Sequence, residues 1–193
     1  MPAPRLLLAL TALVALPASG CGFERTKPPD LETASPPTTF QPLAFPAAGL
    51  TLRAPANWHV ARGPKPLVAA IDSGRATLAV WRYPRSEPLP ESAAEVRTRV
   101  PALLAQVRKR DPSAKLDPPR VGTYGGAPGV MLTGEQTIFG HRERLRSVHV
   151  FGEGAEVVFD AYAPPNQFPR VDRQVFTPVL GSLKVSTPLV GGK

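Results

Sequence analysis

Hydrophobic and polar residues alternate along several stretches of this chain, and a period of two residues is typical of half-buried strands. Leu50 and Leu52 follow this pattern between polar neighbours. A later pair of such stretches is joined by Asp72-Ser73-Gly74-Arg75, a turn sequence whose glycine can adopt a positive φ. The pattern predicts strands over residues 49–53, 67–71, 76–83, 120–124, 130–138, 143–151 and 155–163.

Two other stretches have the helical period. The first begins at Ser92-Ala93-Ala94-Glu95, which has the spacing of a capping box, and its apolar residues are Val96, Val100, Leu103, Leu104 and Val107. Pro101 predicts a kink or a break, and the helix should stop before Pro112. The second helix should end at Gly181, before a short strand at 183–185. Its apolar residues are Phe168, Val171, Val175, Phe176, Val179 and Leu180.

The hairpin loops set the register of the later strands. If Phe139-Gly140 is a two-residue loop, Met131 faces Val148. If Glu153-Gly154 is the next loop, Val148 also faces Phe159. One sheet face then collects Met131, Val148, Val150, Val157 and Phe159, and the other collects Val130, Leu132, Ile138, Leu145, Phe151 and Val158. Because both faces need cover, we expect an α+β fold: an α/β/α sandwich with a central, mainly antiparallel sheet flanked by two main helices.

The N-terminus has the features of an export signal. Arg5 precedes an apolar run from Leu6 to Leu16 that is too short to span a bilayer. The sequence Leu16-Pro17-Ala18-Ser19-Gly20-Cys21 resembles a bacterial lipobox, although Ala18 stands where leucine is usual. Cys21 is the only cysteine in the chain and would carry the lipid. The alternative is a free thiol near a simple cleavage site.

Domain boundaries follow from composition. We expect a signal peptide at residues 1–20 and a proline-rich, extended tether at 21–46. Within the tether, only the region of Phe40, Leu43 and Phe45 has the apolar residues needed to pack on the domain. The folded domain should then occupy residues 47–186, with a flexible tail at 187–193.

The charge of the chain favours acidic neighbours. There are 23 Lys and Arg residues against 15 Asp and Glu, which gives a formal net charge of +8. For an exported protein, anionic lipid head groups or cell-wall polymers are more plausible partners than nucleic acid. No aromatic-plus-basic motif of RNA-binding proteins occurs, so no nucleic-acid partner is predicted.

No recognisable catalytic or metal-binding motif occurs. The chain lacks a Gly-x-Ser-x-Gly elbow, a phosphate-binding loop and a His-Glu-x-x-His motif. Its three histidines, His59, His141 and His149, do not have the spacing of a zinc site. We therefore predict no metal and no cofactor. His149 should be a hydrogen-bonded core histidine. Trp58 either plugs the core or lines a ligand groove.

Arg142, Arg144 and Arg146 alternate along one strand and project from one face, about 7 Å apart. We call them the arginine ladder. Together with Trp58 they form the candidate binding surface, a docking patch for acidic head groups or a partner protein. In the register above Glu135 lies opposite Arg144, so part of the ladder would instead be a cross-strand ion pair.

The order of elements resembles one known superfamily. A strand, a Pro55-Ala56-Asn57-Trp58 turn, a hairpin, a helix, an antiparallel meander, a closing helix and a final Gly181-Ser182-Leu183-Lys184 resemble the PsbP-like superfamily over residues 45–186. The DcrB and LpqN-type lipoproteins are the members that look most similar. The resemblance implies an α/β/α sandwich and a binding or assembly role, without cofactor residues that can be carried over.

Two functions remain in view. The first is a non-catalytic cell-envelope lipoprotein that is anchored through Cys21 on the extracytoplasmic side and binds a protein, lipid or glycan. In a host with two membranes, Gly22 after the cysteine favours the outer one. The alternative is an enzyme with a hydrolase-type site that forms only in the fold. A pocket holding two or more titratable groups within hydrogen-bond reach would favour the enzyme.

The anchor hypothesis predicts that Cys21→Ser yields a soluble exported protein, because no other stretch approaches 18 consecutive apolar residues. Fractionation of cells after a high-salt wash measures this. Retention of the variant in the membrane pellet would remove the main support for a lipobox.

Overall fold

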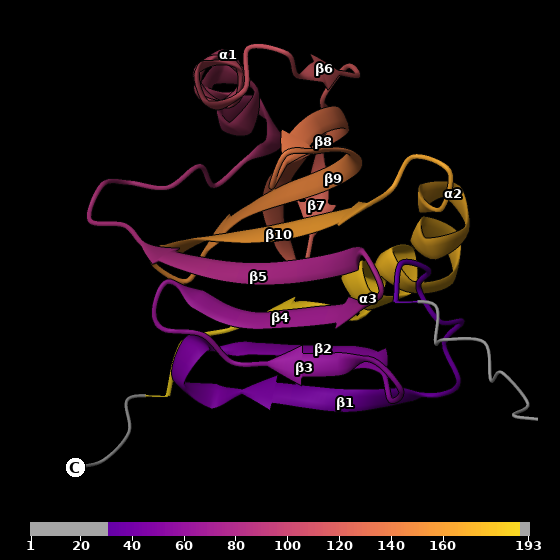
Figure 1. Cartoon of the computed structure of the whole chain (residues 1–193). Helices are drawn as coiled ribbons and strands as arrows, with labels where there is room; N and C mark the ends of the chain where they lie inside the picture. The colour runs from indigo at the N-terminus through magenta and orange to yellow at the C-terminus, as the bar shows by residue number, and fades with distance from the viewer. Residues whose placement is uncertain (1–30, 190–193) are drawn as a thin grey trace, which may run out of the picture.

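The computed structural model describes residues 31–189 and contains two antiparallel sheets (Figure 1). The large sheet has the order β3-β4-β5-β10-β9-β8-β6, with β7 paired to β8. Its strands are β3 (His59–Ala61), β4 (Leu67–Ser73), β5 (Ala76–Pro84), β6 (Lys115–Leu116), β7 (Arg120–Tyr124), β8 (Ala127–Ile138), β9 (His141–Gly152) and β10 (Ala155–Ala163). The small sheet has the order β1 (Phe40–Phe45), β2 (Leu50–Pro55) and β11 (Lys184–Val185).

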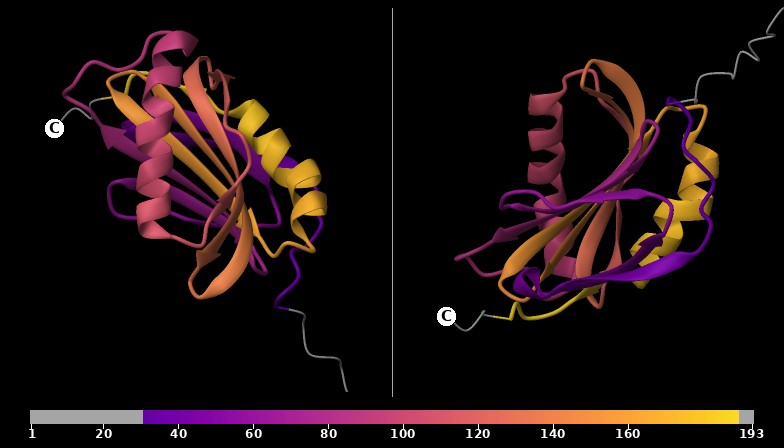
Figure 2. Two further views of the ribbon diagram at one scale, coloured as in Figure 1. Left: turned by 90° about the horizontal axis from the view of Figure 1, so that it is seen from above. Right: turned by 60° about the horizontal axis from the view of Figure 1, so that its bottom comes forward.

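Helices cover both faces of the large sheet. Helix α1 (Ala93–Arg110) lies on one side (Figure 2). The other side carries a closing helical segment made of α2 (Phe168–Val171), a π-helical turn (Asp172–Phe176) and α3 (Thr177–Ser182). The small sheet joins this second layer, since α3 packs on β2. The predicted α+β architecture is confirmed.

The predicted register of the central strands is also confirmed. Met131 pairs with Val148, and Val148 pairs with Phe159. Both sheet faces are buried, as expected from their apolar side chains. On one face Val148, Val150, Val157 and Phe159 pack in a core with Phe176 and Val179; on the other, Val130, Leu132 and Phe151 pack with Val96 and Val107 of α1.

Helix α1 begins as its capping sequence predicts. The Ser92 hydroxyl accepts a hydrogen bond from the Glu95 N–H, and the Glu95 carboxylate accepts one from the Glu91 N–H. The helix ends at Arg110, but the break expected at Pro101 does not occur. Pro101 and Arg97 are both exposed, so water can satisfy the carbonyl that the missing proline N–H leaves without a partner.

The N-terminal boundary predicted for the domain is wrong. Residues 40–45, assigned to the tether, form β1, which pairs along its whole length with β2. Further upstream, Ala34 is only 1% exposed, and its backbone bonds to the side chains of Gln167 and Arg170. Proline does not prevent this packing because β1 is an edge strand, where a missing N–H is tolerated.

The predicted flexible tail also needs correction within the described residues. The Leu189 N–H donates to the Pro46 carbonyl, and the Thr187 hydroxyl bonds to the Glu153 carboxylate. Residues 187–189 therefore lie against the domain. The signal peptide and Cys21 lie outside the described residues.

Trp58 lies in the core at the turn before β3. Its side chain is 4% exposed, its ring meets Phe176 edge-on at 6.4 Å between centroids, and its Nε1–H donates to the Ser35 carbonyl at 3.1 Å. This environment is the one expected of a core residue that joins the N-terminal segment to the closing helix. A role for Trp58 in ligand binding stays a prediction.

We expect Trp58→Ala to lower the free energy of unfolding by about 3–5 kcal/mol, because it leaves a cavity and an unpaired carbonyl. Chemical denaturation measures the change. Phe139→Ala is the matched control, since Phe139 is 89% exposed and its loss should change stability little. Unchanged melting of the Trp58 variant with lost partner binding would instead place the residue in a binding site.

Candidate functional site

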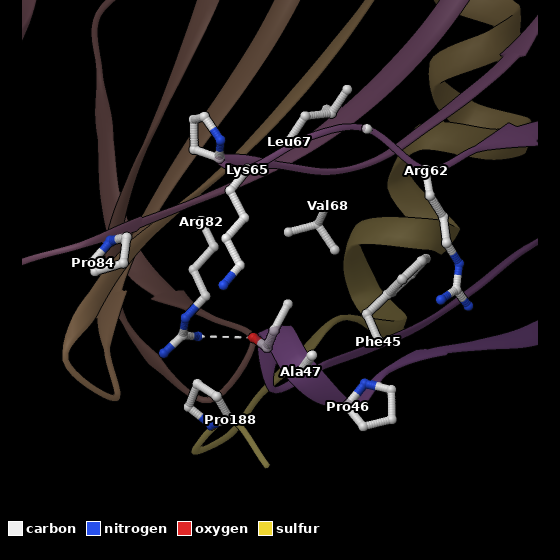
Figure 3. A pocket seen from close by; sticks show the side chains of 13 residues that line it. Phe45, Pro46, Ala47, Arg62, Lys65, Leu67, Val68, Arg82, Pro84 and Pro188 are labelled. Atoms are coloured by element: carbon white, nitrogen blue, oxygen red, sulfur yellow. Dashed lines mark hydrogen bonds between the residues drawn. The ribbon is translucent and has the colours of Figure 1, made fainter. Parts of the chain in front are cut away.

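An apolar pocket lies where the start of β4 and the end of β5 meet the turn after β1. Its volume is about 660 Å³. The apolar walls come from segments distant in the sequence, and their residues are Phe45, Pro46, Ala47, Ala48, Pro66, Leu67, Val68, Pro84 and Pro188 (Figure 3). We call this space the apolar pocket.

Three cations line the apolar pocket, and no acidic residue does. They are Arg62, Lys65 and Arg82. None of them forms a salt bridge within residues 31–189. Arg62 lies over the ring of Phe45, 5.2 Å from its centroid, whereas Lys65 and Arg82 lie toward the other end in Figure 3. The pocket therefore combines apolar walls with three cations that have no salt bridge in the described part of the chain.

Arg82 is the most unusual of these cations because its side chain is buried. The residue is 9% exposed, and burial lowers its pKa. Its guanidinium donates to the Ala48 carbonyl at 3.1 Å and to the Glu153 carbonyl at 2.6 Å. A guanidinium has five N–H donors, so these two bonds leave donors for an anionic group.

Local backbone geometry holds the turn over the pocket. The short helix η1 (Pro46–Ala48) ends at Gly49, which has φ +58°. A side chain at Gly49 would collide with the Ser186 carbonyl. The Ser186 backbone is held in place there, because its N–H donates to the Gly49 carbonyl. Glycine is required at this position, where the N-terminal turn and the C-terminal segment cross.

A second pocket of about 370 Å³ lies between the last turns of α1 and the large sheet. We call it the α1 pocket. Its walls are Tyr83, Arg85, Leu103, Gln106, Lys109, Arg110, Ser147, His149, Glu156, Val158 and Asp160. Unlike the apolar pocket, it is lined mostly by polar and charged side chains.

Hydrogen bonds join four of these residues into one buried network. His149 Nδ1 lies 2.7 Å from Glu156 Oε1, and His149 Nε2 lies 3.3 Å from Ser147 Oγ. Ser147 Oγ also donates to Asp160 Oδ1 at 2.5 Å. Arg85 binds the other oxygen of Glu156. Burial alone would raise the pKa of Glu156, but its bonds from His149 and Arg85 lower it to about 2.

No protein-family model matches the chain, and no curated protein sequence matches it. Solved structures do. The cyanobacterial PsbP (CyanoP) of Synechocystis sp. PCC 6803 superposes with a TM-score of 0.58 at 14% identity, over 77% of this chain and 93% of its own. The chain has the PsbP-like fold. LpqN, described as involved in cell envelope biogenesis of Mycobacterium tuberculosis, superposes at 0.53 with 15% identity over 77% and 91%.

On this PsbP-like fold the arginine ladder is tied to carboxylates. Arg142 Nε lies 3.2 Å from Glu135, and an Nη2 atom of Arg144 lies 2.8 Å from Asp117. Glu135, which the register places opposite Arg144, thus pairs with its diagonal neighbour. An Nη2 atom of Arg146 lies 2.7 Å from Asp172 of the closing helix. These contacts are cross-element ion pairs, and a docking role for the ladder stays a prediction.

Neither pocket is predicted by the sequence. Four separate segments build the apolar pocket, and no sequence pattern connects them. The α1 pocket could have been predicted in part from the strand register. That register places Ser147 opposite Asp160 and His149 opposite Val158, so Ser147, His149 and Asp160 share one face of the sheet. The predicted core histidine, His149, is indeed buried and hydrogen-bonded. Within residues 31–189 no group of ligands suited to a metal occurs, and no helix is long and apolar enough to span a membrane.

Proposed function

We propose that this chain is a non-catalytic cell-envelope protein that binds an anionic lipid in the apolar pocket. The observation that carries the proposal is Arg82, a buried cation beside an apolar wall that forms no salt bridge among residues 31–189. Burying a charge is costly unless an opposite charge and hydrogen bonds compensate. A carboxylate or phosphate head group would supply both.

The rest of the pocket suits the hydrocarbon part of such a ligand. Leu67, Val68 and Phe45 offer apolar surface, which contributes roughly 25 cal/mol for each Å² removed from water. A volume of about 660 Å³ lies within the usual range of small-molecule sites. Lys65 and Arg62 at the walls add attraction for the head group.

Two independent observations support the proposed location. The sequence predicts an exported chain that is lipid-anchored at Cys21. The fold is similar to that of LpqN, whose description places it in cell envelope biogenesis. We take an anionic lipid as the partner in preference to a protein or a glycan, because the pocket joins apolar walls to cations.

Binding is measured with dansylundecanoic acid and its uncharged methyl ester on the soluble Cys21→Ser protein. We expect Arg82→Gln and Lys65→Gln to weaken binding of the acid by about tenfold or more, with little effect on the ester. Lys65 is exposed, so its variant tests the head-group site without risk to the core.

Arg142→Gln is the matched control, because it removes the same charge outside the pocket. If it weakens binding of the acid as much as Arg82→Gln does, the arginine ladder is the docking surface and the pocket proposal fails. Equal affinity of the wild-type protein for the acid and the ester would also overturn the proposal.

A second candidate function is hydrolysis, because the α1 pocket holds titratable groups within hydrogen-bond reach of one another, as an enzyme site would. Ser147, His149 and Glu156 stand in the order of nucleophile, base and orienting acid. Two features weigh against acyl transfer. Ser147 also bonds to Asp160, and its backbone lies between two paired strands, β8 and β10, so its N–H belongs to the sheet and not to an oxyanion hole.

We expect an alkyl fluorophosphonate to leave Ser147 unlabelled, as judged by mass spectrometry of tryptic peptides. Labelling of Ser147 that disappears in His149→Ala would establish the hydrolase instead. Labelling that persists in His149→Ala would reflect unassisted reactivity and would leave the non-catalytic assignment in place.

A further inference from the structure

The three hydrogen bonds of the buried network can all form at once only if the network carries one proton more than its groups ordinarily do. It has three hydrogen bonds in series, from Glu156 to His149, from His149 to Ser147 and from Ser147 to Asp160. Each bond requires one hydrogen. A neutral histidine with Nδ1–H supplies the first, and the serine hydroxyl supplies only one of the other two.

Without that proton, Ser147 donates to an ionised Asp160, as in the structure, and no hydrogen is left for the contact between His149 Nε2 and Ser147. One added proton can complete the series in two ways. If His149 is protonated, Nε2–H donates to Ser147 and the hydroxyl donates to an ionised Asp160. If Asp160 is protonated, it donates to Ser147 and the hydroxyl donates to Nε2. Burial raises the pKa of Asp160 more than the bond from Ser147 lowers it, which favours the second arrangement. Glu156 stays ionised in both, because Arg85 and His149 hold it.

Charged groups from α1 and β5 face this network across the α1 pocket. The titratable and charged groups around it are Tyr83 and Arg85 from β5, Lys109 and Arg110 from α1, and Glu156 and Asp160 from β10. Lys109 and Arg110 form no salt bridge within the described part of the chain. Burial raises the pKa values of Tyr83 and Asp160, and the nearby charge of Arg110 opposes that rise.

We propose that the α1 pocket binds a doubly charged tetrahedral oxyanion, the chemistry of a phosphate or sulfate group, and takes up one proton as it does so. Lys109 and Arg110 supply the charge, and Tyr83 and Gln106 supply polar contacts. With the extra proton, the network is neutral beside the Arg85–Glu156 pair. Without it, an ionised Asp160 repels the anion. Anion and proton therefore strengthen each other's binding.

Inorganic sulfate is the probe, because it keeps its charge between pH 6 and 8. Calorimetric titration of the Cys21→Ser protein at one pH, in buffers with different heats of ionisation, measures the protons taken up. We expect uptake of about one proton per bound sulfate at neutral pH and tighter binding as the pH falls, by up to about tenfold per unit.

Two variants distinguish the contribution of anion binding from that of proton uptake. Asp160→Asn keeps the shape of the side chain and places an amide N–H where the protonated carboxyl would donate. It should bind sulfate without proton uptake and with an affinity that no longer depends on pH. Lys109→Gln with Arg110→Gln should weaken sulfate binding by about tenfold or more. Arg108→Gln is the matched control, since Arg108 is exposed on the same turn but does not line the pocket.

Absence of sulfate binding, or binding without proton uptake in the parent protein, overturns the proposal. So does a loss in Arg108→Gln equal to that in the double variant, or acetate binding as tightly as sulfate. Glycerol phosphate and inorganic phosphate, compared at one pH, then distinguish a phosphate ester from the free ion. These outcomes are independent of the apolar pocket, whose ligand and variants differ.

Discussion

The strands β8, β9 and β10 are apolar on both faces, and the rest of the structure depends on covering them. One face needs α1, and the other needs the closing helix together with the small sheet. Because a covering layer contacts a twisted sheet over only part of its area, space remains at its margins. The α1 pocket lies at the margin of one layer, and the apolar pocket lies at the margin of the other.

Arginines in this protein occur in two electrostatic settings. Those of the ladder lie against carboxylates from neighbouring elements and help to hold the closing helix and the β6 region in place. Arg82 and its neighbours in the apolar pocket have no such partner in residues 31–189. Net positive charge alone does not reveal this difference, because both kinds of arginine contribute equally to it. The distribution of acidic residues decides which cations are available to a ligand.

Local patterns were sufficient to predict the central part of the fold. Two-residue loops at Phe139-Gly140 and Glu153-Gly154 fix the register of β8, β9 and β10, because a hairpin loop of known length leaves no freedom in pairing. The same patterns misplaced the N-terminal boundary. Prolines suggested a free tether, but the pairing of β1 with β2 depends on a partner that a local pattern does not contain. The pockets were missed for the same reason, since tertiary packing brings their walls together.

The path of β1 has a consequence for how the domain is oriented. Residues 32–35 lie beside Arg75, Ser73 and the closing helix, at one end of the hairpin formed by β4 and β5. The apolar pocket lies at the other end of that hairpin, beyond the last residue of β1. A strand of six residues spans about 20 Å, so the attachment side and the pocket are separated by most of the domain. If Cys21 fixes the chain to a membrane, the polypeptide that leads to the anchor enters the domain at the end opposite the pocket mouth, so a ligand can reach the pocket without passing the point of entry.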